Sequence, residues 1–561
     1  MVNEKNSAFR KYLPYFIFLL MFIYVIWGLV KVQIVEQSEH KQLLNELLGS
    51  SDYSRGLRGS IYSSDGVKLA WSEQIPIISM KTYTTEDDAR LREFLTTEQI
   101  VSIKNTGQAE LTWEQALLLK SIGYETTTIE RRKSYGFLYQ IIGSVNIDGE
   151  GVSGMESVYN DLLKGKVSVS YGVTNPSGSY EQGFIENTGE NGMDLQTTIN
   201  YGLQKFSYDL LTELATPSVI IVSDVKTGDI LAMASYPSPE IDMNSLDNIS
   251  WEKILNDPMK PLLNRAISST YPPGSAFKVI TAFAQLLYGR PNTVTCNGVF
   301  TYKDSKGRVT GRYKDWLLSG HGVVDLKKAL RVSCNVYFYN AAIDVGADNI
   351  AKVARAFYLD QKTGINIPGE VVGTLPSPEW KVENIGENWY PGDTILYGIG
   401  QGFLNVTPLQ MITLYNTIAN RGTFVKPKLL INEEVVSKKI LLDIPDPYWD
   451  LVIQGLEEVT TVQGSGANAG TAAASFKGFP ITVAGKTGTA QVGSGQPHAW
   501  FVGFGPSRQP MYSVLVLVEH GESGGHFAAP VARKIFDYMY QNGFFEDIQS
   551  NQDAVTSKNE S

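Results

Sequence analysis

Cysteine and histidine are scarce in this chain of 561 residues. It has two cysteines, Cys296 and Cys334, and five histidines, and none of them stands at the short spacing of a metal-binding motif such as HExxH or CxxC. We therefore expect no metal. Two cysteines form one disulfide at most, so a disulfide framework is excluded. A single disulfide and two buried free thiols both remain open for this pair.

Positive charge is also in short supply. Lys and Arg number 48 against 58 Asp and Glu. The resulting net charge of -10 argues against nucleic acid as a partner, because phosphate backbones attract basic surfaces. A hydrophobic content of 43% with 19% charged residues excludes wholesale disorder. The length suits two or three domains.

Long apolar runs are limited to one, near the N-terminus. The 19 residues from Tyr12 to Val30 carry no charge, and as a helix they nearly span the hydrocarbon core of a bilayer. Residues 12–33 are therefore predicted to be a single-pass membrane anchor. A cleaved signal peptide is the alternative, but residues 32–36 lack the small-residue pattern of a cleavage site.

The charges that flank this run predict its orientation. Lys5, Arg10 and Lys11 precede it, against a single acidic residue, Glu4. By the positive-inside rule, residues 1–11 lie in the cytoplasm and the chain that follows the anchor lies outside the cell membrane.

The outer chain has two regions of different character. Residues 34–200 contain one clear helix, expected at 112–122 with Thr112 as its cap, and a glycine-rich segment at 176–193, expected to be an exposed loop near a domain boundary. Residues 201–545 are more regular. Residues 546–561 form a polar tail that we expect to be disordered.

Residues 201–545 carry the signals of an α+β domain. Residues 276–287 are apolar on nearly every side, which predicts a helix inside a large core. The other expected elements are strands 219–224, 229–234, 481–484, 500–504 and 512–518 and a closing helix, 530–540. A central helix with an antiparallel sheet defines the α+β class.

Three short motifs lie in this domain. Ser275 and Lys278 are three residues apart, so on a helix they share one face and the amine can activate the hydroxyl. Ser333-Cys334-Asn335 lies in an apolar stretch, and Lys486-Thr487-Gly488 follows a predicted strand, where glycine lets another backbone approach closely.

Each of these patterns is weak alone, because each has further matches in the chain. The other matches are Ser38 and Ser223 for S-x-x-K, Ser144 and Ser557 for S-x-N, and Lys226 and Lys362 for K-T-G. Local context separates them. Ser275 opens the buried helix, where unpaired N–H groups favour developing negative charge, whereas Lys226 lies in a hairpin turn and Ser38 in a polar segment.

In this order, and at separations of 58 and 153 residues, the three motifs resemble those of the penicillin-binding proteins. The segments from Arg58 to Ala70 and from Gly154 to Tyr159 resemble the pedestal of the class B members. Gly400-Gln401-Gly402 and Trp500 to Gly503 resemble their transpeptidase domain. The resemblance implies a membrane helix, an elongated pedestal at 34–200 and, at 201–545, a transpeptidase domain with a central antiparallel sheet flanked by helices. It implies no glycosyltransferase domain.

The resemblance also implies a peptidoglycan D,D-transpeptidase. Ser275 would attack the D-Ala-D-Ala amide of a stem peptide with Lys278 as its base, and Ser333 and Asn335 would relay the proton and hold the peptide. The residues implied to bind the substrate are Lys486, Thr487, Gly488 and Thr489, and the backbone N–H groups of Ser275 and Thr489 would form the oxyanion hole. β-Lactams would acylate the same serine. No cofactor is implied, and a SEDS-type glycan polymerase in the membrane is the expected partner.

Two other functions remain as alternatives. One is a noncatalytic penicillin-binding scaffold or β-lactam sensor. The other is a β-lactamase, for which no carboxylate can be placed near the acyl-enzyme from the sequence.

The charge states of the two motif lysines are expected to differ. Burial and the nearby Lys486 are expected to keep Lys278 neutral, while Lys486 faces the substrate and stays charged. Arg265 is expected to be a structural ion-pair partner. Elongation, division and spore-wall roles are not distinguished.

Overall fold

The structure is a computed structural model, and it describes residues 20–22, 24–25, 51–174, 180–185, 190–239, 242, 248–290 and 292–546. The predicted anchor and tail lie almost wholly outside these residues. Within the described stretches, no helix has the length and apolar character needed to cross a membrane. The chain divides into two compact units, Met1–Arg58 with Lys164–Gly192 and Gly59–Leu163 with Met193–Ser561. The domain boundary expected at residues 200 and 201 lies within the second unit.

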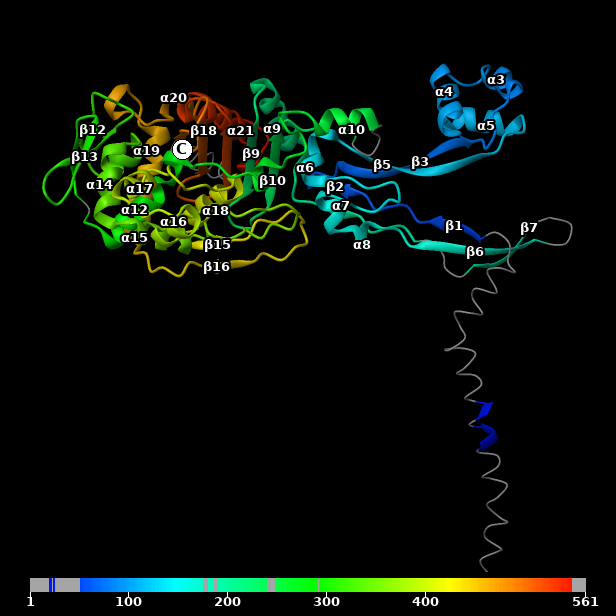
Figure 1. Cartoon of the computed structure of the whole chain (residues 1–561), viewed down its shortest axis with the longest axis horizontal. Helices are drawn as coiled ribbons and strands as arrows, with labels where there is room; N and C mark the ends of the chain where they lie inside the picture. The colour runs from blue at the N-terminus through cyan, green and yellow to red at the C-terminus, as the bar shows by residue number, and fades with distance from the viewer. Residues whose placement is uncertain are drawn as a thin grey trace, which may run out of the picture. The chain divides into compact units, whose positions relative to one another are not determined.

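The first unit contains a three-stranded antiparallel sheet in the order β1-β6-β7 (Figure 1). Its strands are β1 Ser51–Arg55, β6 Val167–Thr174 and β7 Tyr180–Ile185. The prediction of a loop over 176–193 is therefore wrong in part, because β7 lies inside it. A polar, glycine-containing segment does not favour a strand by itself, but pairing with β6 supplies the backbone hydrogen bonds that stabilise one.

The N-terminal part of the second unit is built around a long strand, β3. It pairs with β2, β4 and β5, and β2 pairs in parallel with β8. The strands are β2 Ile61–Tyr62, β3 Lys68–Ser79, β4 Gln108–Glu110, β5 Thr126–Ser134 and β8 Leu195–Gln196. The helices are α3 Thr85–Leu91, α4 Thr97–Thr106, α5 Trp113–Ser121, η2 Gly136–Leu138, α6 Tyr139–Ile142, α7 Gly154–Val158 and α8 Asn160–Leu163.

A capped helix and a buried ion pair are two features of this part. Thr112 caps α5 in a capping box with Gln115, which confirms the helix expected at 112–122. The buried carboxylate of Glu156 accepts a hydrogen bond of 2.7 Å from Arg132, so the two opposite charges leave water as a pair.

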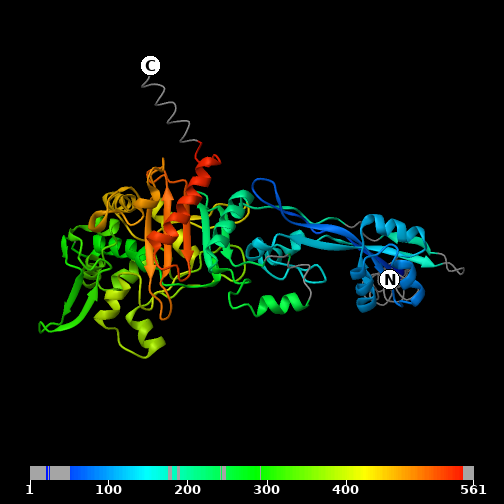
Figure 2. The same cartoon turned by 90° about the horizontal axis from the view of Figure 1, so that it is seen from above.

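The rest of the second unit contains a five-stranded antiparallel sheet in the order β10-β9-β19-β18-β17 (Figure 2). The strands are β9 Ser218–Asp224, β10 Ile230–Tyr236, β17 Ala484–Ala490, β18 His498–Gly505 and β19 Tyr512–Val518. Four of the predicted strands are confirmed, and β19 has the predicted bounds. The fifth begins later than expected, at Ala484, because pairing with β18 runs from Ala484 to Ala490. The K-T-G motif therefore lies within the strand, at an edge of the sheet.

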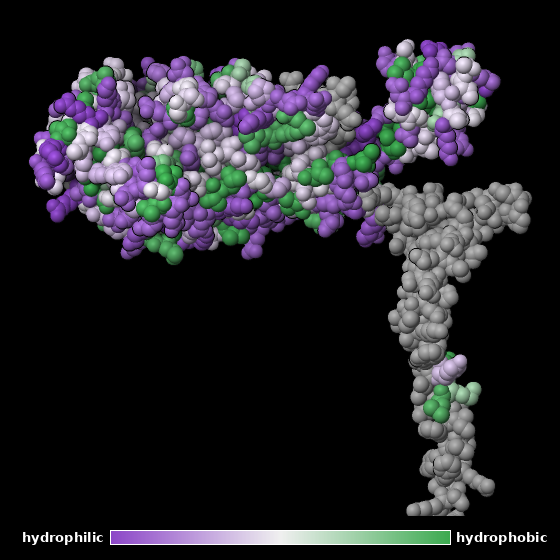
Figure 3. Space-filling view, in the orientation of Figure 1, coloured by the Kyte–Doolittle hydropathy of each residue, from purple (hydrophilic) through white to green (hydrophobic). Residues whose placement is uncertain are grey.

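Helices cover both faces of this sheet. In β9, Ile220 and Val222 pack with α9 Tyr201–Leu214 and α21 Ala529–Gln541. The alternating residues Val219 and Ile221 belong to the other core, with α12 Lys278–Tyr288 and α18 Pro408–Ala419. Side chains alternate between the faces of a strand, so apolar residues at every position mark a sheet buried on both sides. On the side seen in Figure 3, the surface is mostly hydrophilic, with scattered apolar residues.

The remaining elements surround this sheet. The helices are α10 Asn248–Leu255, α11 Arg265–Ser268, η4 Gly274–Phe277, α13 Leu326–Arg331, α14 Asn335–Val345, α15 Ala347–Ala356, α16 Pro378–Ile385, α17 Pro391–Tyr397, α19 Asp446–Thr461, η5 Gly466–Asn468, α20 Ala473–Phe476 and η6 Gly524–Ala528. The strands are β11 Val294–Cys296, β12 Val299–Lys303, β13 Val309–Lys314, β14 Gly322–Val324, β15 Thr423–Val425 and β16 Ser437–Lys439. The α+β content and the helix-flanked antiparallel sheet agree with the predicted class.

Candidate active site

Ser275 lies in η4, the single 3-10 turn that leads into α12. The helix predicted at 276–287 is present, although its α-helical part starts at Lys278. Gly274 has a φ of +51°, and a Cβ there would lie 2.8 Å from the carbonyl oxygen of Thr489. Glycine thus lets the serine turn approach the K-T-G strand closely. The backbone N–H of Gly274 donates to Gly400 O at 2.9 Å, in the Gly-Gln-Gly segment.

Lys278 is fully buried on the first turn of α12. Its Nζ donates to Ser333 O at 2.8 Å and to Asn335 Oδ1 at 2.6 Å, and lies 3.3 Å from Ser333 Oγ. Burial lowers the pKa of Lys278 from 10.5 to about 8, while the negative charge of Asp315 acts in the opposite direction. The direction expected from the sequence is therefore confirmed for this amine.

The S-x-N motif forms the turn between α13 and α14. Ser333 has a φ of +55°, a strained conformation for a residue with a side chain. Cys334 caps α14, since its Sγ accepts from Tyr337 N at 3.4 Å, and Asp315 Oδ2 accepts from Val336 N at 3.0 Å. These bonds fix the start of α14 and so the positions of both polar residues that flank Cys334.

The K-T-G strand β17 brings the remaining predicted residues to the same place. Thr487 is mostly buried, and Thr489 is exposed, with its Oγ1 accepting from Gly524 N at 3.2 Å. Gly488 also lies close to the serine turn. A Cβ there would lie 2.9 Å from Pro273 O and 3.0 Å from Trp500 Cβ, so glycine lets β17 pack against the serine turn.

Lys486 behaves differently from the expectation. Its side chain is fully buried, and its Nζ donates to the carbonyl oxygen of Thr487 at 3.0 Å. Burial, with the neighbouring charge of Lys278, holds the pKa of Lys486 well below its ordinary value of 10.5. For the free protein, this lowering runs against the expectation that Lys486 stays charged. A bound carboxylate would favour its charged form and raise the pKa again.

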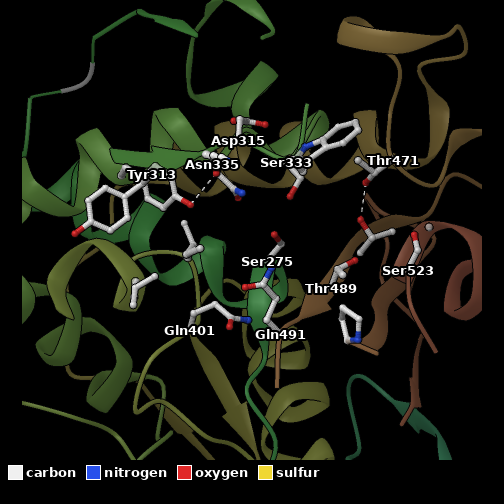
Figure 4. Close-up of a pocket in the computed structure, with 18 of the residues that line it drawn as sticks. Ser275, Tyr313, Asp315, Ser333, Asn335, Gln401, Thr471, Thr489, Gln491 and Ser523 are labelled. Atoms are coloured by element: carbon white, nitrogen blue, oxygen red, sulfur yellow. Dashed lines mark hydrogen bonds between the residues drawn. The ribbon is translucent and has the colours of Figure 1, made fainter. Parts of the chain in front are cut away.

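These elements enclose a cavity of about 840 Å³. Five of the predicted residues line it: Ser275, Ser333, Asn335, Thr487 and Thr489. Figure 4 shows the Ser275 side chain pointing into the space below Ser333 and Asn335, with Thr489 at one side. Lys278, Lys486 and Gly488 lie behind this surface and contribute no lining side chain.

The cavity also contains residues that the sequence analysis did not assign to it. They include Tyr313 in β13, Gln401 after α17, Thr471 before α20, Gln491 after β17, Ser523 before η6 and His526 in η6. Gln401 belongs to the Gly-Gln-Gly segment that carried part of the resemblance, and its buried Nε2 has no hydrogen-bond partner among the described residues. Thr471 has no such signal, because it belongs to no recognised motif.

The further matches to the motifs have structural explanations. Lys226 lies in the exposed turn between β9 and β10 and donates to Asn420 Oδ1 at 2.8 Å. The Thr363-Gly364 turn is held by Glu370, whose carboxylate accepts from both backbone N–H groups. Ser38 and Ser557 lie outside the described residues. Arg265 pairs with Glu519 at 3.0 Å, as a structural ion pair does.

Four buried side chains behind the S-x-N motif could hold a metal ion. Cys296, Asp315, His321 and Cys334 offer ligand atoms that all lie within 4.8 Å of one another. Both cysteines are buried free thiols, which settles the alternative left open above. Two thiols, an imidazole and a carboxylate are ligands that Zn²⁺ takes in tetrahedral sites. The expectation of no metal rested on sequence spacing, whereas the fold and not a short motif assembles this set.

Known proteins of one family are similar to this chain in sequence. Residues 218–537 match the family described as "Penicillin binding protein transpeptidase domain". The chain is 32% identical over 418 residues to peptidoglycan D,D-transpeptidase MrdA of Acinetobacter baumannii, an alignment that covers 69% of this chain and 60% of that protein. It is 31% identical over 373 residues to peptidoglycan D,D-transpeptidase PbpA of Mycolicibacterium smegmatis, with 61% and 71% covered.

A solved structure extends the likeness beyond the matched domain. Penicillin-binding protein PBP2 of Helicobacter pylori, in complex with MreC, has a TM-score of 0.76 and 26% identity, covering 88% of this chain and 99% of that one. The fold and the site define a penicillin-binding transpeptidase domain. The chain therefore belongs to the penicillin-binding protein family, among its class B members.

Proposed function

We propose that this protein is a serine-type peptidoglycan D,D-transpeptidase that cross-links stem peptides and is acylated by β-lactams. The observation that carries the proposal is the buried amine of Lys278, held by Ser333 and Asn335 behind a cavity that Ser275 lines. The chain spans 60% of the length of the A. baumannii relative.

The amine of Lys278 is suited to act as the base for Ser275. A neutral primary amine has two N–H groups and one lone pair. The carbonyl oxygens of Ser333 and Asn335 accept its two short hydrogen bonds, which leaves the lone pair to take the serine proton. With its pKa at about 8, a useful fraction of the amine is neutral near pH 7.

The acyl transfer then proceeds in two steps. Ser275 Oγ adds to the carbonyl carbon of the D-Ala-D-Ala amide, and the amide C–N bond breaks as the terminal D-alanine leaves with a proton returned through the Lys278 and Ser333 side chains. An amine of a second stem peptide attacks the resulting ester, forms the new amide and releases Ser275. Backbone N–H groups of Ser275 and Thr489 are the proposed oxyanion hole.

The substrate carboxylate is assigned to the β17 end of the cavity. The hydroxyls of Thr487 and Thr489 line this end, Gly488 holds the strand against the serine turn, and Lys486 lies buried behind. A carboxylate bound by the two hydroxyls would also favour the charged form of Lys486 behind them.

The polar composition of the cavity favours a transpeptidase over a β-lactamase. Hydrolysis of the acyl-enzyme needs a group that activates water. Among the described residues that line the cavity, Asp315 is the one carboxylate, and its oxygens already accept from the backbone N–H groups of Leu317 and Val336. Slow release of bound β-lactam is the expected consequence.

The proposal extends to the parts of the chain around this domain. It places a membrane anchor at 12–33 with residues 1–11 in the cytoplasm, a pedestal at 34–200, the transpeptidase domain at 201–545 outside the membrane and a disordered tail at 546–561. A SEDS-type polymerase would supply the glycan strands. The H. pylori relative was solved in complex with MreC, so a partner of that kind is also part of the proposal. Replacing residues 1–33 with an unrelated anchor should weaken co-purification with the polymerase.

The activity is tested by three readouts on the full-length protein. Release of D-alanine and cross-linked product from lipid-linked strands, with slow loss of bound penicillin, is the transpeptidase result. Rapid penicillin hydrolysis would mark a β-lactamase, and acylation without any peptide chemistry would mark a scaffold or sensor.

A further inference from the structure

Thr471 connects the two walls of the cavity that carry the S-x-N and K-T-G motifs. It follows α19 and precedes α20, far in sequence from both motifs. Its Oγ1 lies 2.6 Å from Thr487 Oγ1, the shortest hydroxyl contact in the cavity lining, and Figure 4 shows this bond at the end of the pocket beside Ser523. Its backbone N–H donates to the carbonyl oxygen of Arg331, two residues before Ser333.

The backbone around Thr471 is fixed on both sides. Gly470 N donates to Val462 O at 2.9 Å, and Ala472 N donates to Val459 O at 3.0 Å, so the residue is held against the end of α19. That helix is itself anchored to α13, because Glu458 pairs with Arg331 at 3.0 Å. These bonds fix the backbone of Thr471, and with it the point from which its hydroxyl reaches Thr487.

The contact with Thr471 limits where the Thr487 proton can point. Two hydroxyls 2.6 Å apart share one hydrogen bond, so one donates and the other accepts. When an anion binds at Thr487, that hydroxyl must donate to it, and Thr471 must then donate to Thr487 Oγ1. A donor chain ending on a carboxylate is shortened and strengthened by each hydroxyl behind the first.

We propose that Thr471 is a positioning residue that sets the selectivity of this site for ligands with a free carboxylate next to the reacting amide. It acts through Thr487 and does not touch the reacting atoms. This inference rests on the proposed function, because the carboxylate in question is that of a D-Ala-D-Ala stem peptide or a β-lactam.

The test compares a penicillin with its neutral methyl ester on the full-length protein. The second-order acylation constant is measured with both ligands for the parent, Thr471→Val, Thr471→Ala and Thr471→Ser. Thr461→Val is the matched control, since Thr461 is an exposed threonine at the end of α19 whose hydroxyl donates to Glu457 O of its own helix. Thermal melting of each variant shows whether it is folded.

Thr471→Val and Thr471→Ala should lower the constant for the free acid by about tenfold and leave that for the ester within about twofold, so that the ratio between the ligands falls. Thr471→Ser keeps a hydroxyl and should keep the parent's ratio, and Thr461→Val should not change the ratio either. An unchanged ratio in folded Thr471→Val or Thr471→Ala overturns the inference, as does an equal loss for both ligands. If the parent protein is not acylated by either ligand, the proposed function fails and this inference fails with it.

Discussion

Lys278 Nζ and Asn335 Oδ1 lie 2.6 Å apart, which joins the first turn of the serine helix α12 to the first residue of α14. The two residues are 57 positions apart in the chain. An amide oxygen accepts but does not donate, so the amine must present an N–H to it in either protonation state. This bond helps to orient the amine. In its neutral form the amine keeps one lone pair that can accept a proton.

The rate of acylation should follow the ionisation of Lys278. Because only the neutral amine accepts the serine proton and its pKa is about 8, the rate should rise about tenfold per pH unit below this value and level off above it. Lys278→Ala should lower acylation by a factor of about 10² to 10⁴ and remove this slope. Stopped-flow penicillin acylation from pH 6 to 10 measures both, with Lys477→Ala, an exposed lysine, as the control. A parent-like rate in Lys278→Ala would mean that another group is the base.

Asn335→Asp should move the pH profile without destroying the site. The substitution keeps the shape of the side chain and places a negative charge beside the amine, which favours its charged form and raises the pKa of Lys278. Acylation at pH 7 should fall, and most of it should return at pH 9 to 10. Asn335→Ala, which adds no charge, should lose activity at every pH. If the aspartate variant has the parent's profile, the amine and Asn335 are not coupled.

The metal-ligand set behind the S-x-N turn should bind zinc in the folded protein. Elemental analysis of parent protein purified without chelator should give about one Zn²⁺ per chain, and Cys296→Ser should bind far less because a thiolate ligand is lost. A strong chelator should lower the melting temperature of the parent and hardly affect that of the variant. Metal-free parent protein whose melting temperature does not respond to added zinc would contradict this expectation.

Gly274→Ala should destabilise the serine turn more than its backbone conformation alone predicts. Gly274 and Gly478 both have positive φ, but a Cβ at Gly274 meets Thr489 O at 2.8 Å, whereas nothing lies within 4 Å of one at Gly478. Gly478→Ala should therefore cost about 1 kcal/mol in unfolding free energy, and Gly274→Ala clearly more, with slower acylation. Chemical denaturation of both variants gives the comparison. Equal costs would show that β17 and the serine turn can separate freely.

Much of the fold was predictable where the pattern is local. The β9 and β10 strands with their turn, the strand at 512–518 and the apolar helix after Ser275 all follow from hydrophobic runs and turn residues. The β7 strand was missed because its stability comes from its neighbour β6. The start of β17 was misplaced for the same reason, since its pairing with β18 decides where the strand begins.

The site was predictable only as far as motifs mark it. The residues of S-x-x-K, S-x-N and K-T-G do converge. Lys278, Lys486 and Gly488 nevertheless lie behind the cavity surface, and motif spacing does not indicate which side chains reach that surface. Thr471 and the four metal ligands come from separate segments that only the tertiary structure brings together. The low pKa of Lys486 likewise depends on full burial, which a sequence near a sheet edge does not predict.

Ser275 is the proposed nucleophile of a penicillin-reactive site. The direct measurement is covalent labelling of the full-length protein with a fluorescent penicillin, followed by mapping of the modified peptide. The account predicts that the label sits on Ser275 and that Ser275→Ala abolishes it while the melting temperature stays close to that of the parent. A label that persists in this variant, or that maps to Ser38 or Ser223, would contradict the account.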